Sequence, residues 1–226
     1  MIYFTIFEIK YIISFFMKHF ILMADIINSG KKEQKPLMED FKNLIEEVNK
    51  IYKTDILSPL TITLGDEFQG IIKNLAASIQ IILTLEENCI HKKLNFKLRY
   101  VLNQGEIETP INEKIAYEML GSGLTDARLK LNDSKYKKFR FNISIDNLLQ
   151  QSVLNDAFII FEKITDKWSF KNDYDLASNF IQFKDYKIIS EKMNKTRSLI
   201  WKREKTLQIE SYNATKNIMH TITSIK

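Results

Sequence analysis

The spacing of apolar residues along the first part of the chain predicts strands and helices. The apolar run His19–Ala24 is typical of a buried strand. Apolar and β-branched residues alternate on both sides of Gly65-Asp66, which predicts a hairpin over 61–72 with a turn at its tip. Similar patterns predict further strands over 95–102 and 138–145 and helices over 36–53, 74–88, 115–131 and 146–161.

The order of these elements indicates an α+β fold over residues 17–164. We expect a four-stranded sheet of the ferredoxin-like or polymerase-palm kind, with helices on one face. In that topology the strand 19–24 lies antiparallel beside the second strand of the hairpin. Asp25 then falls beside Asp66 at one edge of the sheet, Glu67 points outward, and Gly105 marks the end of the strand 95–102.

After residue 164 the pattern changes to short amphipathic helices, which we expect over 174–183, 186–194, 196–206 and 209–222, after a linker over 165–170. Asn194 tolerates the left-handed conformation required at a tight corner, and Thr196 is a good N-cap for the next helix. Ser190 is small where two helices must approach. One core is expected to hold Ile189, Met193, Leu199 and Ile200. We interpret residues 165–226 as a small all-α helix-turn-helix domain.

Composition and the N-terminal residues narrow the class of protein. The chain has 226 residues, of which 45% are hydrophobic and 27% charged, as in a globular protein with room for two domains. Cys89 is the single cysteine, so no intrachain disulfide forms and a cytoplasmic location fits best.

Residues 1–16 are too short and too charged to span a bilayer. They are an N-terminal extension or lie upstream of a true start at Met17. Trp168 and Trp201 are expected to pack in cores.

The net charge of +5 is concentrated at the C-terminal end. Residues 181–226 contain ten Lys or Arg and four Asp or Glu, a balance of +6, which leaves −1 for the first 180 residues. This asymmetry favours a neutral body with a tail that meets polyanions. The alternative is that the basic helices only pack on the body and present a solvated lysine face.

Asp25 and Asp66 are the candidate metal ligands. Two carboxylates held by rigid strands at one point suit Mg²⁺ bound to nucleotide phosphates. Each residue alone has a simpler reading, because Asp is also common as a helix N-cap and in turns.

Four segments together resemble a known catalytic core. MADIINSG, TLGDEFQG, LRYVLNQG and LGSGLTDARLKL are similar to the core shared by class III nucleotidyl cyclases and GGDEF domains. In detail, and over nearly everything from Met17 onward, the sequence is most similar to the SatD family. Members of that family pair such a domain with a C-terminal helix-turn-helix.

The resemblance implies roles for single residues. Asp25 and Asp66 would hold two divalent ions, Mg²⁺ or Mn²⁺, assisted by the carbonyl of Ile26. Arg128 would contact the reacting phosphate of a nucleoside triphosphate, and Arg99 opens the matching strand motif. Backbone N–H groups at Asn28, Ser29 and Gly30, at the mouth of the following helix, would cradle the triphosphate.

The sequence also departs from the cyclase pattern. Ile62 replaces the purine-reading lysine, Leu124 an asparagine and Val101 a glycine. These changes favour nucleotide binding over cyclisation, and an ion-pair role for Arg128 stays open.

Three functions are consistent with these observations. The first is a cytoplasmic regulatory protein that senses a nucleotide with Mg²⁺ and binds DNA; the second is a divergent nucleotidyl cyclase or nucleotidyltransferase; the third is an interaction module with a vestigial site. A homodimer is a further option for the cyclase reading. The residues expected at the DNA are Lys195, Thr196, Arg197, Ser198, Lys202 and Arg203.

Overall fold

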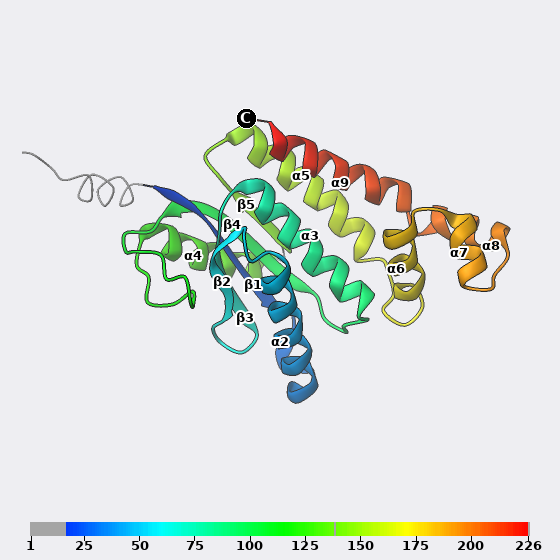
Figure 1. Cartoon of the computed structure of the whole chain (residues 1–226), viewed down its shortest axis with the longest axis horizontal. Helices are drawn as coiled ribbons and strands as arrows, with labels where there is room; N and C mark the ends of the chain where they lie inside the picture. Colours follow the sequence, from blue (N-terminus) through cyan, green and yellow to red (C-terminus); the bar gives the residue numbers. More distant parts are fainter. Residues whose placement is uncertain (1–16, 138, 226) are drawn as a thin grey trace, which may run out of the picture.

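The computed structural model of the chain describes residues 17–137 and 139–225 (Figure 1), so the expectation for residues 1–16 lies outside the described part. The order of elements up to residue 165 is β1 (Lys18–Ile26), η1 (Ser29–Lys31), α2 (Gln34–Ile51), β2 (Ile56–Ile62), β3 (Glu67–Ile72), α3 (Leu75–His91), β4 (Leu98–Glu106), α4 (Ser122–Lys137), β5 (Phe141–Ser144) and α5 (Leu148–Thr165). The predicted hairpin is present as β2 and β3. Gly65 takes a positive φ of 84° in its turn, a conformation that favours glycine.

The strands form one five-stranded sheet in the order β2-β3-β1-β4-β5. β1 lies in the centre and pairs antiparallel with both β3 and β4, as predicted for β3. β5 pairs parallel to β4. The prediction of four strands was therefore wrong, because every segment with strand-like alternation joins the same sheet.

Both faces of the sheet are covered, which corrects the prediction of helices on one face. Leu22 and Ala24 of β1 pack in the cluster that α2, α3 and α5 share. Ile21 and Met23 point to the other face, into a cluster with α4. Figure 1 shows α4 on the side of the sheet away from α3 and α5. The period-2 alternation of a strand places successive side chains on opposite faces, so β1 contributes to both cores.

The start of α4 differs from the predicted helix 115–131. The residues before Ser122 form a loop that is held to the hairpin side of the sheet, where the N–H of Ala116 donates to Thr61 Oγ1 at 2.9 Å. Gly105 is the last residue but one of β4, which runs on beyond the predicted end at 102. A Cβ on Gly123 would lie only 2.6 Å from the backbone carbon of Gly105. The two glycines thus allow α4 and β4 to approach more closely than any side chain permits.

The C-terminal helices are α6 (Tyr174–Phe183), α7 (Tyr186–Lys192), α8 (Arg197–Thr206) and α9 (Ile209–Ser224). In Figure 1, α9 runs alongside α5, whereas α6, α7 and α8 gather at one end of the molecule. The ring of Tyr212 on α9 lies 5.4 Å from that of Phe161 on α5 and 5.2 Å from that of Trp168. The apolar core of the sheet therefore continues into these helices. The division at 164/165 stays a prediction.

The corner between α7 and α8 has the predicted local structure. Asn194 is left-handed with a φ of 51°, and the side chain of Thr196 accepts from the N–H of Leu199. Ile189, Ser190 and Ile200 are buried. Leu199 and Trp201 are 44% and 48% exposed, however, so the expectation that both pack in cores was wrong. On this short helix Ile200 faces inward, whereas Leu199 and Trp201, directly before and after it in the sequence, project away from the core.

Within the described residues, none of the helices combines the length and the apolar character that crossing a bilayer requires.

Candidate functional site

The end of β1 and the tip of the hairpin lie side by side, as the sequence predicted. Asp25 is in register with Glu67 on β3 and with Arg99 on β4. The N–H of Ile26 donates to the carbonyl of Asp66 at 2.8 Å. The backbones that carry the two predicted metal ligands are therefore in direct contact.

Asp25 is a buried carboxylate that contacts two cations. It is 4% exposed, and its two oxygens lie 3.2 and 3.0 Å from Arg99 Nη1. Lys135 Nζ, on α4, lies 3.4 Å away. Burial raises the pKa of Asp25, the charges of Arg99 and Lys135 partly offset this, and Glu67 raises the pKa further. Asp25 belongs to β1, so the alternative of a helix N-cap does not apply.

Glu67 is a site residue that the sequence analysis placed wrongly. It was expected to face outward but is buried, forms an ion pair with Arg128, and lies 3.9 Å from Lys135. Its position follows from its register with Asp25, because directly opposed residues of antiparallel strands project to the same face. The predicted pairing placed Asp25 beside Asp66 and gave no register for Glu67. Arg128 is thus in the ion pair that was left open as its alternative role.

Asp66 and the turn after β1 form the other half of the site. The half-buried carboxylate of Asp66 accepts from Ser29 Oγ at 2.5 Å. The contacts of Asp66 are therefore different from those of Asp25, and within the described part of the chain the two carboxylates share no partner. Asn28 and Gly30 are exposed; Asn28 precedes η1, Gly30 lies within it, and α2 begins only at Gln34. The expectation that 28–30 lie at the mouth of the following helix was wrong, because the short η1 intervenes.

The charges at this edge of the sheet balance. Three carboxylates, of Asp25, Asp66 and Glu67, lie close to three cationic side chains, of Arg99, Arg128 and Lys135. Among the described residues, no three Asp, Glu, His or Cys side chains converge as a metal cage. A divalent cation here would take its remaining ligands from water or phosphate oxygens, as Mg²⁺ commonly does at nucleotide sites.

One atom at this edge has an unused hydrogen-bonding capacity. Arg99 Nε is buried and has no hydrogen-bond partner in the described part of the chain. A buried donor without a partner is costly, and such a donor commonly marks a place that a ligand or water completes. A guanidinium next to a buried carboxylate fits a phosphate group better than a further cation.

The sequence model of the SatD family matches residues 19–223. The chain belongs to the SatD family. A search of the curated proteins found no match. The similar solved structures include the guanylyl cyclase domain of the RhoGC fusion protein from the aquatic fungus Blastocladiella emersonii, with 17% identity, coverage of 54% of this chain and 84% of that one, and a TM-score of 0.36. A bacterial light-regulated adenylyl cyclase has 12% identity and a TM-score of 0.40, and the match covers 56% of this chain and 43% of that one.

The predicted DNA contacts of this SatD family member lie around the corner between α7 and α8. Five of the six residues are exposed: Lys195, Thr196, Arg197, Ser198 and Lys202. Arg203 is different, because its guanidinium forms an ion pair with Asp173, just before α6. It holds α8 to the preceding segment and does not extend outward with the others.

Proposed function

We propose that this SatD family protein is a cytoplasmic regulatory protein that binds a nucleoside triphosphate together with Mg²⁺ or Mn²⁺ where β1 meets the hairpin. The observation that carries the proposal is the buried, unpartnered Arg99 Nε beside the carboxylate of Asp25. The phosphates would bind Arg99, with Arg128 and Lys135 close by. Asp25, Asp66 and the carbonyl of Ile26 would hold the cation, and the backbone of Asn28–Gly30 would meet the outer phosphates.

The charge balance supports joint binding of cation and nucleotide. A cation alone would face three positive side chains, and a triphosphate alone would face three carboxylates. Each component offsets the unfavourable charge that the other meets, so we expect both to bind weakly alone and tightly together. The cation would neutralise phosphate charge and orient the phosphates.

Asp66→Asn is expected to weaken binding of ATP with Mg²⁺ by at least about tenfold, because an amide is a poor ligand for a hard cation. Isothermal titration calorimetry on the full chain measures this affinity. Asp126→Asn is the matched control, since Asp126 is an exposed residue of α4. Equal affinities for wild type and Asp66→Asn would contradict the proposal.

Conversion of any of the four nucleoside triphosphates by wild type and not by Asp66→Asn would assign the site to the alternative function, a nucleotidyl cyclase or nucleotidyltransferase.

The second part of the proposal is that α7 and α8 form a helix-turn-helix that binds DNA. The left-handed corner at Asn194, the buried Ser190 between the helices and the basic exposed face of α8 support it. Arg203 is withdrawn from the proposed contacts, because it is engaged with Asp173.

Lys202→Gln is expected to weaken binding to a mixed-sequence DNA duplex and to reduce the slope of log K against log salt by about one. A gel-shift titration at several salt concentrations, with and without ATP and Mg²⁺, measures both quantities. Lys163→Gln, on the exposed side of α5, is the control for a lost charge. If wild type gives no shift at any salt concentration, DNA binding is excluded and the helices serve only to pack on the body.

A further inference from the structure

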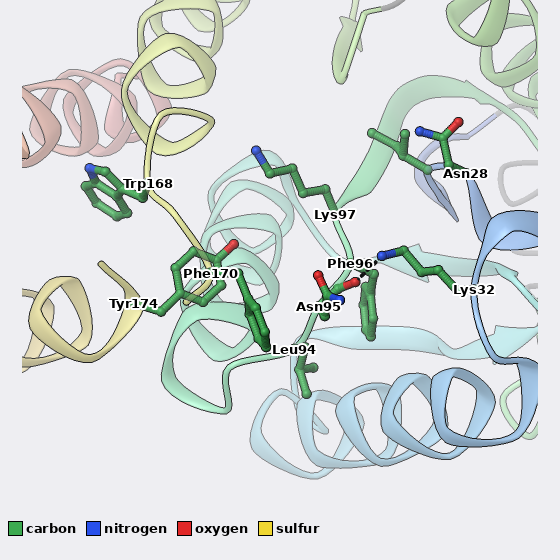
Figure 2. Close-up of a pocket in the computed structure, with 10 residues that line it drawn as sticks. Asn28, Lys32, Leu94, Asn95, Phe96, Lys97, Trp168, Phe170 and Tyr174 are labelled. Carbon is green, nitrogen blue, oxygen red and sulfur yellow. Dashed lines mark hydrogen bonds between the residues drawn. The ribbon is translucent and has the colours of Figure 1, made fainter. Parts of the chain in front are cut away.

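A cavity separate from this site lies on the other side of the turn after β1, where three distant segments meet. Its walls come from Asn28 and Lys32, from the loop between α3 and β4, and from the segment between α5 and α6 (Figure 2). The cavity has a volume of about 350 Å³. This size and the mixture of aromatic and polar walls are typical of sites for small organic ligands. None of the three carboxylates of the site described above lines it.

The polar groups of this cavity favour an anion. As far as the described residues show, its lining includes two lysines, Lys32 and Lys97, and no carboxylate. Lys97 Nζ contacts Asp166 Oδ1 at 2.8 Å, outside the lining, and Asp166 also pairs with Arg140. Lys32 donates to the backbone carbonyl of Asn95 and has no carboxylate partner within the described residues. The cavity is therefore positively charged, and at least one ammonium group is not neutralised by a protein acid.

The other walls are aromatic. The half-buried ring of Phe170 meets that of Tyr174 edge to face, with ring centroids 5.8 Å apart. In Figure 2 the hydroxyl of Tyr174 points into the space between the labelled residues, and it has no hydrogen-bond partner within the described part of the chain. Burial, and to a lesser extent the charge of Glu86, raise the pKa of Tyr174 to about 12, so the hydroxyl stays neutral and is able to donate. A planar ring bound here would contact aromatic faces and a free donor.

Two amide side chains are further polar groups of this cavity. Asn28 and Asn95 are exposed residues at the cavity, and each carries both donors and acceptors. A nucleobase edge also presents both kinds of group, whereas a simple aromatic acid does not. Lysine is a common ligand of phosphate. Aromatic faces, amides and lysines therefore occur together in the combination that a mononucleotide requires.

We propose that this cavity binds a nucleoside monophosphate without a metal ion, with its base against Phe170 and its phosphate at Lys97 and Lys32. The site does not depend on the function proposed above. Its ligand would bridge the sheet side of the molecule and the segment that leads into α6. Asp166 is the C-cap residue of α5 and pairs with Lys97, so a phosphate at Lys97 competes with this ion pair, while Asp166 keeps its pair with Arg140.

The test is a titration of the full chain with AMP in the presence of EDTA. Binding is monitored by the fluorescence of Trp168, which lines the cavity. A Trp201→Phe background removes the other tryptophan. We expect saturable binding that is weakened by about tenfold or more in Lys97→Gln and in Lys32→Gln, the usual effect of losing a hydrogen bond to a charged group. Phe170→Leu should also weaken it. Lys53→Gln, an exposed lysine elsewhere, should bind as the background does.

The outcomes separate this site from the first one. Asp66→Asn should leave AMP binding unchanged; if it abolishes binding and Lys97→Gln does not, AMP binds at the end of β1 and the proposal fails. Absence of saturable binding, or equal affinity in the two lysine variants and the background, also overturns it. Benzoate is a simple aromatic acid that lacks the donors and acceptors of a nucleobase. If it binds as tightly as AMP, the assignment of a nucleotide as the ligand is wrong. Thermal melts of each variant identify any that is unfolded. Lys32 is half-buried and donates to a backbone carbonyl, whereas Lys97 forms an ion pair with Asp166, so Lys32→Gln breaks no ion pair among the described residues.

Discussion

Arg140→Met should lower the free energy of unfolding by about 3–5 kcal/mol, the usual cost of removing one partner from a buried ion pair. Arg140 is 4% exposed. Its Nη2 lies 2.6 Å from Glu86 Oε2, its Nη1 lies 2.5 Å from Asp166 Oδ1, and its Nε donates to the carbonyl of Leu98 at 3.1 Å. Burial lowers the pKa of Arg140, but Glu86 and Asp166 raise it by more, so the guanidinium stays charged. Removing it leaves the carboxylate of Glu86 in the core with Tyr100 as its remaining donor among the described residues.

Urea unfolding of wild type and variants measures this effect. The double variant Glu86→Gln, Arg140→Met should recover part of the loss, because it removes the uncompensated charge as well. Lys42→Met is the surface control. It breaks the exposed Lys42–Glu46 pair on α2 and should cost no more than about 0.5 kcal/mol. If Arg140→Met costs as little as Lys42→Met, the network does not hold α3, β4 and the end of α5 together.

The second large effect is expected for Gly123→Ala, about 1–3 kcal/mol of lost stability together with weaker nucleotide binding. The added Cβ would meet the backbone of Gly105 at 2.6 Å and that of Glu106 at 2.8 Å. Backbone atoms of a central strand cannot move aside as a flexible side chain can, so α4 must shift away from β4. Arg128 and Lys135 lie on α4 and contact Glu67 and Asp25, so the shift also disturbs the site.

The matched control for stability, though not for affinity because Gly30 belongs to the proposed nucleotide site, is Gly30→Ala. Among the described residues other than its chain neighbours, no atom lies within 4 Å of a Cβ placed there, and stability should change by less than about 0.5 kcal/mol. Urea unfolding gives the stabilities, and the calorimetric titration with ATP and Mg²⁺ gives the affinities. If Gly123→Ala unfolds at the same urea concentration as wild type and binds as tightly, then the close approach of α4 to β4 is not required for either property.

The SatD family resemblance and most of the elements followed from the sequence alone. The hairpin, the strand that carries Asp25 and the helices α2, α3 and α6 are set by local patterns, namely a glycine turn, an apolar run and a 3.6-residue stripe. Asn74 caps α3 and Thr196 caps α8 because capping involves only residues three apart along the chain.

Tertiary structure decided which charged side chains meet. Glu67 was expected to face solvent, yet α4 covers that face of the sheet and brings Arg128 to it. Nothing in the local pattern indicates that Gly105 and Gly123 touch, since the contact joins segments that are adjacent only after the sheet and helix have packed. The same holds for the proposed monophosphate cavity, whose walls come from residues as far apart as Lys32 and Phe170. Local periodicity determines which face of an element is apolar; which other element covers that face depends on the packing of the whole chain.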